Sequence, residues 1–393
     1  MTADRVVRLF AVIACVLLWT PLASAQTVSD ILLFLLTNES VPTGSQARDR
    51  AAAVATSDTI SRMVLASLAT LPVPTSSGGF VYRLNPELGT VERTTPGFGP
   101  SFVERAQAVG RGQASFGLTF QHLRFDALDG RNLRDGSFVT TANEFPDEAA
   151  PFDVDQLTLA LDASVATLYG GVGVTDRLEI GFAAPMVLLS VEGTRINIYR
   201  SGAFTQASAR ARAAGLADLV ARAKYTVYDA PHGALAAAVD VRLPTGRTED
   251  LLGAGSASTL ISGIGSGGRG PLTAHVNAGI SMGGLARELR YSGALEVAAA
   301  PRFTAIGEVL GRWIDTPGHI VTESTANQIL PGVQIVRLVP GTSRLRTLTA
   351  VPGLKWNVSD TWVLAASVTI PLTSSGLTAP MTPFVGLDYA WRP

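Results

Sequence analysis

The chain contains very little cysteine, lysine or charge. Its one cysteine is Cys15, and its only lysines are Lys224 and Lys355. Charged residues make up 16% of the 393 residues, whereas about 25% is usual in a soluble domain. If residues 1–25 are removed on export, as argued below, the mature chain has no cysteine, which excludes disulfide and thiol chemistry.

The sequence also lacks features that would suggest a spanning helix, a metal site or an enzyme. After residue 25, no stretch offers the roughly 20 consecutive apolar residues that a transmembrane helix needs. The net charge of −1 argues against nucleic acid as a partner. There is no Gly-x-Ser-x-Gly nucleophile motif. No metal-ligand spacing links His122, His232, His275 and His319 to one another or to carboxylates. We therefore expect no enzymatic activity, metal or cofactor.

Residues 1–25 have the features of a secretory signal peptide. Arg5 and Arg8 form the positive end, residues 9–18 are apolar, and Ala23-Ser24-Ala25 is a small-residue cleavage site before Gln26. An alternative is a lipoprotein signal ending at Cys15, but cleavage there would cut the apolar run in half. We predict export through the inner membrane.

Alternating segments dominate the rest of the chain. In residues 271–282, Leu272, Val276 and Ile280 fall on one side and Thr273, His275 and Asn277 on the other. A strand has a period of two, so this segment has one apolar face and one polar face. About ten such residues, tilted, cross a bilayer. Repetition of this pattern predicts an all-β fold, a transmembrane antiparallel barrel with lipid outside and a polar lumen inside.

We count about twelve such segments in residues 110–393. The connections after even-numbered segments are very short, whereas several after odd-numbered ones are long (126–154, 193–216, 246–254 and 316–344). Short periplasmic turns and long extracellular loops are typical of outer-membrane barrels. The segments are 110–124, 155–173, 177–192, 217–228, 233–245, 255–266, 271–283, 288–300, 302–315, 345–358, 360–373 and 380–392.

Residues 26–109 differ from the barrel region and are too polar to span a membrane. Ser29-Asp30 could cap a short helix over 31–36, and residues 46–70 have helical periodicity. Residues 79–95 suggest a hairpin around Asn85-Pro86-Glu87. If this hairpin entered the wall, the strand count would be fourteen. We expect 26–109 to form a partly helical plug in the lumen or at its periplasmic mouth; a loosely attached periplasmic extension is the alternative.

Charged and polar residues at the alternate strand positions that face inward are candidates for lining the lumen. Both signs occur on neighbouring segments, so they can pair across strands or contact a substrate. Pro185 is a separate candidate, because proline cannot donate to the ladder and the segment continues beyond it. It predicts a local bulge or a kink that opens the wall. The lumen candidates are Arg222, Lys224, Asp240, Arg242, His275, Asn277, Glu296, Arg302, Glu308 and Arg312.

Several segments resemble the MetA-pathway of phenol degradation family of outer-membrane proteins. They are 79–83, 105–120, 173–180, 215–225 and 241–256, of which the stretch beginning Val241-Arg-Leu-Pro-Thr-Gly is the most specific. The resemblance implies a barrel similar to the fatty-acid and aromatic-hydrocarbon transporters, which carry an N-terminal plug. It brings no catalytic residues.

Together these features predict a monomeric channel in the cell outer membrane for passive uptake of small apolar or aromatic compounds. Its expected partners are that small ligand and outer-membrane lipid. The alternative is a structural or general outer-membrane barrel without a dedicated substrate, in which charged side chains seal the lumen.

Overall fold

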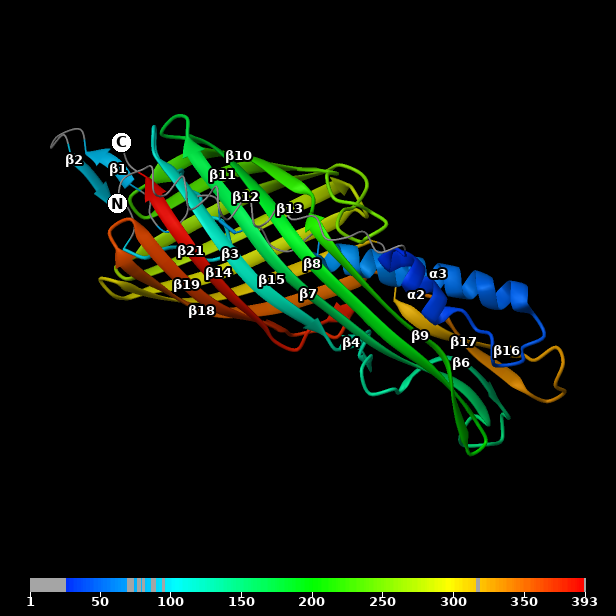
Figure 1. Ribbon diagram of the computed structural model, residues 1–393. Coiled ribbons are helices and arrows are strands. Elements are labelled where there is room, and N and C mark those ends of the chain that lie inside the picture. Colours follow the sequence, from blue (N-terminus) through cyan, green and yellow to red (C-terminus); the bar gives the residue numbers. More distant parts are fainter. Residues whose placement is uncertain are drawn as a thin grey trace.

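A computed structural model describes residues 26–68, 74–75, 79, 82–85, 90–93, 96–315 and 319–391. The expected signal peptide lies outside the described residues. The chain forms a closed antiparallel barrel of 12 strands (Figure 1). Its strands are β3 (Ala114–Phe125), β7 (Asp153–Gly173), β8 (Leu178–Tyr199), β10 (Leu219–Ala230), β11 (Gly233–Leu243), β12 (Ser258–Arg269), β13 (Leu272–Gly283), β14 (Glu288–Ala300), β15 (Phe303–Ile314), β18 (Leu345–Ser359), β19 (Trp362–Pro371) and β21 (Thr382–Trp391).

The barrel closes between its first strands and its last. β3 pairs with β21 on one side and with β7 on the other, and β7 pairs in turn with β8. The expected hairpin in 79–95 is present as β1 (Tyr82–Asn85) and β2 (Thr90–Arg93), which pair only with each other. It forms a separate two-stranded sheet beyond the end of the barrel (Figure 1). The fourteen-strand alternative is therefore wrong, and the twelve-strand fold is confirmed.

The outer surface of the barrel is apolar. Along β13, Leu272, Val276 and Ile280 are exposed, whereas Thr273 and His275 are buried on the inner side. A closed barrel leaves no unpaired edge in lipid, and an outward apolar band is the surface that lipid requires. The protein is therefore an outer-membrane β-barrel.

Aromatic side chains mark both ends of this band. At the end with short turns, Phe303 stacks on Trp356, with ring centroids 6.0 Å apart. At the other end, Tyr291 meets Trp313 edge to face at 6.0 Å. Tryptophan and tyrosine prefer the two membrane interfaces, so these pairs mark the periplasmic and extracellular boundaries of the band.

Two wall strands continue far beyond the membrane. β7 has 21 residues and β8 has 22, about twice the 9–11 that cross a bilayer. Their outer halves carry further strands, and we call this six-stranded extension the wing (Figure 1). Its order is β16 (Ile320–Ala326), β17 (Gln334–Pro340), β6 (Phe138–Glu144), β7, β8 and β9 (Gly202–Leu216).

The wing corrects our expectation of long loops at 126–154, 193–216 and 316–344. These segments contain β6, β9, β16 and β17, together with two short strands that pair with a third short strand from residues 377–378. In β9 the inward residues are small alanines, such as Ala207 and Ala211, and the outward ones include arginines, so the apolar face was easily overlooked. The short strands are β4 (Ala127–Leu128), β5 (Arg131–Asn132) and β20 (Leu377–Thr378).

Two helices pack on the wing. α2 (Val28–Leu36) begins at a capping box of Thr27 and Asp30, not at Ser29 as expected. It lies against β8 and β9, where Gly193 allows close approach, because a Cβ there would lie 2.4 Å from a Leu35 methyl. α3 (Gln46–Leu68) contacts β17 and ends above the lumen. Among the described residues, no helix is long and apolar enough to span a membrane.

Buried polar contacts hold these helices to the wing. Asp49 of α3 forms an ion pair with Arg337 of β17 at 3.1 Å, with both side chains almost fully buried. The Thr56 hydroxyl donates to the Leu338 carbonyl at 3.1 Å. The helices thus lie at the extracellular end, and the expectation that all of 26–109 lies in the lumen or at its periplasmic mouth is wrong for these two helices. In the wing, the residues on the inner side of the strands form the face on which these helices pack.

Candidate functional site

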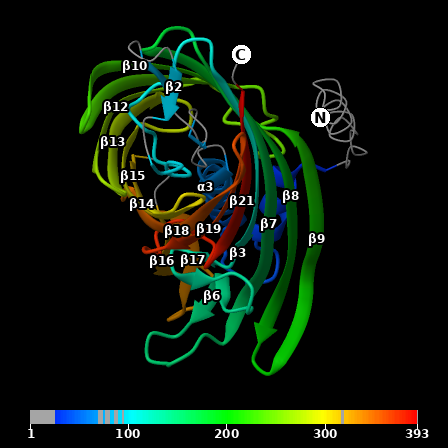
Figure 2. The same ribbon diagram turned by 90° about the vertical axis from the view of Figure 1, so that its left-hand side faces the viewer.

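A loop enters the lumen from the periplasmic end, and we call residues 97–110 the plug loop. The Phe98 N–H donates to the Thr304 hydroxyl at 3.1 Å, and the Gly99 N–H donates to Glu296 at 2.7 Å. Thr304 directly follows the first residue of β15, so this contact lies just inside the periplasmic end. Seen along the barrel from that end, α3 lies behind the barrel opening (Figure 2).

One wall carboxylate organises the tip of the plug loop. Glu308, which is 2% exposed, accepts backbone N–H groups from Ser101, Phe102 and Val103 at 2.8–2.9 Å. Three consecutive donors aimed at one carboxylate form a compact anion-binding turn. Hydrogen bonds to an ionised acceptor are the strong ones, so Glu308 fixes the height of the loop in the barrel.

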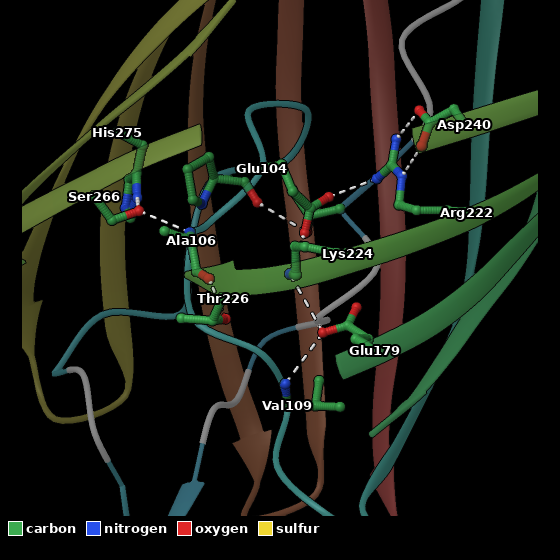
Figure 3. A network of polar contacts seen from close by, with 12 residues as sticks. Glu104, Ala106, Val109, Glu179, Arg222, Lys224, Thr226, Asp240, Ser266 and His275 are labelled. Carbon is green, nitrogen blue, oxygen red and sulfur yellow. Dashed lines mark hydrogen bonds and ion pairs between the residues drawn. The ribbon is translucent and has the colours of Figure 1, made fainter. Parts of the chain in front are cut away.

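The returning half of the loop is held by a chain of ion pairs (Figure 3). Glu104 accepts from Lys224 Nζ at 2.9 Å and from Arg222 Nη1 at 2.6 Å. Arg222 also binds Asp240 of the neighbouring strand through two nitrogens, each at 2.6 Å. Lys224 reaches Glu179 at 3.3 Å, and Glu179 accepts the Val109 N–H at 3.1 Å. The network links the plug loop to β8, β10 and β11.

A serine, a histidine and a glutamate lie in a row across β12, β13 and β14. Ser266 Oγ is 2.8 Å from His275 Nδ1, and His275 Nε2 is 3.3 Å from Glu296. This order is that of a nucleophile, a base and an orienting acid. However, the Ser266 hydroxyl also accepts the Ala106 N–H at 2.9 Å (Figure 3). All three side chains are buried. Through Ser266 and Glu296, the row anchors the plug loop.

Lys355 and Asp388 belong to the same inner surface but were not singled out from the sequence. Lys355 Nζ donates to the Pro100 carbonyl at 2.9 Å and lies 3.8 Å from Asp388. Both face inward on strands with alternating patterns, so their positions in that alternation were enough to identify them. Glu104, in contrast, lies in an irregular segment where no periodicity indicates direction.

Above the plug loop, the extracellular half of the lumen holds a cavity of about 280 Å³. Phe102 and Glu104 of the loop form its floor, and Ser67 at the end of α3 lies at its upper side. Its wall combines apolar residues with four arginines. The arginines are Arg222, Arg242, Arg290 and Arg312, and the larger apolar residues include Leu123, Phe125, Leu260, Leu310 and Leu377.

The structure places most of the expected lumen residues on the inner surface of the barrel. Arg302 is the exception, because it lies exposed in the turn between β14 and β15. The Asn277 amide, oriented to match its partners, pairs with the backbone N–H and carbonyl of Glu104 at 2.7 and 3.0 Å. The inward residues are Arg222, Lys224, Asp240, Arg242, His275, Asn277, Glu296, Glu308 and Arg312.

Pro185 lies at a change of partner in the wall. β8 continues through it without a register shift against β7, where it opposes Thr167. On its other side, β8 pairs with β10 up to Ala183 and with β9 from Met186 onward.

The Ala217 N–H donates to the Pro185 carbonyl at 2.8 Å, and the Thr245 hydroxyl donates to the Ala217 carbonyl at 2.8 Å. Thr245 thus supplies the donor that proline lacks, and the irregularity lies in the neighbouring chain at 217–218.

The described residues contain no group of three His, Cys, Asp or Glu side chains that could hold a metal ion. The geometry as a whole defines a class: an outer-membrane barrel with an extracellular wing, a loop fixed in its lower lumen and a cavity above that loop.

No family model and no curated protein matches the sequence. Among solved structures, the chain is similar to an outer-membrane channel from Pseudomonas putida F1, with 13% identity, a TM-score of 0.46 and coverage of 73% of this chain and 98% of that one. It is also similar to the KdgM porin in complex with disordered oligogalacturonate (6% identity, TM-score 0.36, 70% and 99% coverage). A third is OprB from Pseudomonas putida at low pH (9%, 0.28, 71% and 92%). At these identities the likeness concerns the barrel fold only.

Proposed function

We propose that the protein is an outer-membrane channel for passive uptake of small apolar or aromatic compounds. The observation that carries this proposal is the cavity above the plug loop. A barrel that served only as a structural element would gain stability by filling this space with side chains. Here about 280 Å³ is open and partly lined by Leu123, Phe125 and Leu310. That volume is close to the lower end of small-molecule pockets, roughly 300–1,000 Å³.

The nature of the plug contacts supports a route past the loop. Glu308, Glu296 and Glu179 each bind backbone N–H groups of the loop, whereas its apolar clusters are small. Water can replace a hydrogen bond to a charged group at a net cost of about 1.5–3 kcal/mol each. A loop held in this way can shift within an aqueous lumen without exposing a large apolar core. We propose this shift as the gate and assign no enzymatic step.

The proposed ligand class also rests on the resemblance to the phenol degradation family. We propose membership of that family, with a monomer surrounded by outer-membrane lipid as the working form. Pairing of β7 with β8 is unbroken, and beside Pro185 the Thr245 hydroxyl supplies the hydrogen bond that proline cannot donate. These observations favour a route through the lumen over one through an opening in the wall.

Uptake of a fluorescent apolar probe tests the proposal. Gram-negative cells lacking and expressing the protein would be mixed with N-phenyl-1-naphthylamine, whose fluorescence rises when it enters the inner leaflet. Expression should accelerate that rise, while entry of the polar substrate nitrocefin to a periplasmic β-lactamase should change little. Equal rates of apolar uptake with and without the protein would favour the structural barrel.

A further inference from the structure

Arg242 of β11 is a buried cation without a direct partner. Its side chain is 8% exposed and lines the cavity above the plug loop. Within the described part of the chain, it forms neither a hydrogen bond nor an ion pair, because Asp240, the nearest acidic residue along its strand, is occupied by Arg222. A guanidinium has five donors and stays charged. Burying it unpaired is costly, so its position calls for an anion.

Two further arginines extend the positive surface beside Arg242. Arg290 and Arg312 share one carboxylate, that of Glu288: Arg290 binds it at 3.0 and 3.1 Å, and Arg312 binds it through Nε. Arg312 Nη1 donates to the Ala66 carbonyl at 3.1 Å, whereas its Nη2 is buried without a partner. Two arginines thus share a single carboxylate. Arg290 repels the charge of Arg242, whereas Asp218, Asp240 and Glu288 attract it without direct contact.

An apolar part of the cavity wall lies across the lumen from these arginines, and serines, threonines and the carboxylates of Glu104 and Asp240 complete the lining. Leu123 and Phe125 belong to β3, which is several strands away from β11 and β14 in either direction around the barrel. Phe102 of the plug loop packs edge to face on Phe384 at 4.7 Å and closes the cavity below. A molecule in the cavity would meet donors on one side and hydrocarbon on the other.

We propose that this cavity binds a small carboxylic acid, with its carboxylate at Arg242 and its ring or alkyl body against Leu123 and Phe125. A guanidinium matches the planar carboxylate in a bidentate geometry. The small volume and the apolar wall select a compact aromatic or aliphatic acid over a polyanion. As a step in uptake, this site rests on the proposed channel function and favours, among small apolar compounds, those with an acidic group.

Equilibrium binding to the purified full-length protein in detergent tests the site. Three probes separate the contributions: benzoate, the uncharged benzyl alcohol, and acetate, which has the charge without the ring. Isothermal titration calorimetry should show benzoate binding more tightly than either of the others. Arg242→Gln should weaken benzoate binding by roughly tenfold or more, the usual effect of losing a hydrogen bond to a charged group. It should leave benzyl alcohol binding unchanged.

Arg302→Gln is the matched control, because this arginine lies exposed in a periplasmic turn away from the cavity. It should bind benzoate like the wild type. Arg242→Lys keeps the charge and should retain part of the affinity, which guards against a folding defect of the glutamine variant.

Equal affinity for benzoate and benzyl alcohol, or unchanged benzoate binding by Arg242→Gln, would overturn the site. Acetate binding as tightly as benzoate would overturn its apolar half. If the wild-type protein binds benzoate as expected but its expression does not accelerate apolar probe uptake in cells, the channel function is wrong and the site stands.

Discussion

Lys224 of the wall binds Glu104 of the plug loop at 2.9 Å, in a lumen region where both side chains are almost fully buried. The same ammonium lies 3.3 Å from Glu179, so one cation serves two carboxylates from different parts of the chain. Removing one partner of a buried ion pair is much more destabilising than replacing the whole pair. The loop position therefore depends on this residue.

Lys224→Met should loosen the plug loop while leaving the barrel closed. Glu179 would lose its close cation, whereas Arg222 would still bind Glu104. We expect a loss of about 3 kcal/mol in the free energy of unfolding. Trypsin should then cut after Arg105, which is fully buried in the wild type. Adding Glu179→Gln should restore part of the stability, since the unpaired carboxylate is removed. Identical protease resistance of Lys224→Met and wild type would show that the ion pair does not hold the loop.

The apolar outer face gives a second prediction. Val276 is 62% exposed in the middle of β13, within the apolar band that faces hydrocarbon. Val276→Arg should lower stability by roughly 2–4 kcal/mol, measured by urea unfolding in lipid vesicles. Phe204→Arg is the matched control, because Phe204 is similarly exposed but lies on β9 in the extracellular wing. If both substitutions cost the same, the band around Val276 does not face lipid.

A double-mutant cycle tests the hydrogen bonding at Pro185, where β8 changes its partner strand. Thr245→Val removes the hydroxyl that serves the Ala217 carbonyl and should destabilise the barrel by about 1–3 kcal/mol. Pro185→Val restores a backbone N–H directed at the same carbonyl, because the two residues continue the register of β8 and β9. The double variant should be more stable than Thr245→Val alone. Strict additivity of the two changes would mean that Thr245 does not substitute for the missing donor.

The row of Ser266, His275 and Glu296 should be chemically inert. The Ser266 hydroxyl is engaged by His275 and by the Ala106 N–H, and the cavity above the loop does not include it. A fluorophosphonate probe should fail to label the intact protein in detergent, as judged by mass spectrometry. Ser266→Ala should lower stability and leave apolar probe uptake in place. Stoichiometric labelling of Ser266 would instead indicate a nucleophile and reopen the enzymatic alternative.

The sequence predicts the barrel well because lipid and lumen impose opposite chemistry on alternate residues. All twelve segments correspond to strands, and the inward parity identified Glu308 and Lys224 correctly. The same reasoning missed β9, whose inner residues are alanines such as Ala207. In the wing, a helix and not lipid covers the face, so small residues suffice.

Contacts of irregular segments are much harder to predict. Glu104 binds two cations from β10, about 120 residues later in the chain, and nothing in its local sequence indicates a direction. Arg302 shows the opposite error, since its parity is right for the lumen but the strand begins one residue later. Pairing between distant segments and the ends of strands depend on the assembled barrel.

A reversible lock on the plug loop tests whether ligands pass this loop. The hydroxyls of Ser101 in the loop and Ser367 on β19 lie 3.5 Å apart, so Ser101→Cys with Ser367→Cys should form a disulfide. Each single variant is the control. In cells, the oxidised double variant should take up N-phenyl-1-naphthylamine no faster than cells without the protein, and a reductant should restore the rate of the single variants. Uptake that stays fast in the fully oxidised double variant would contradict a route past the plug loop.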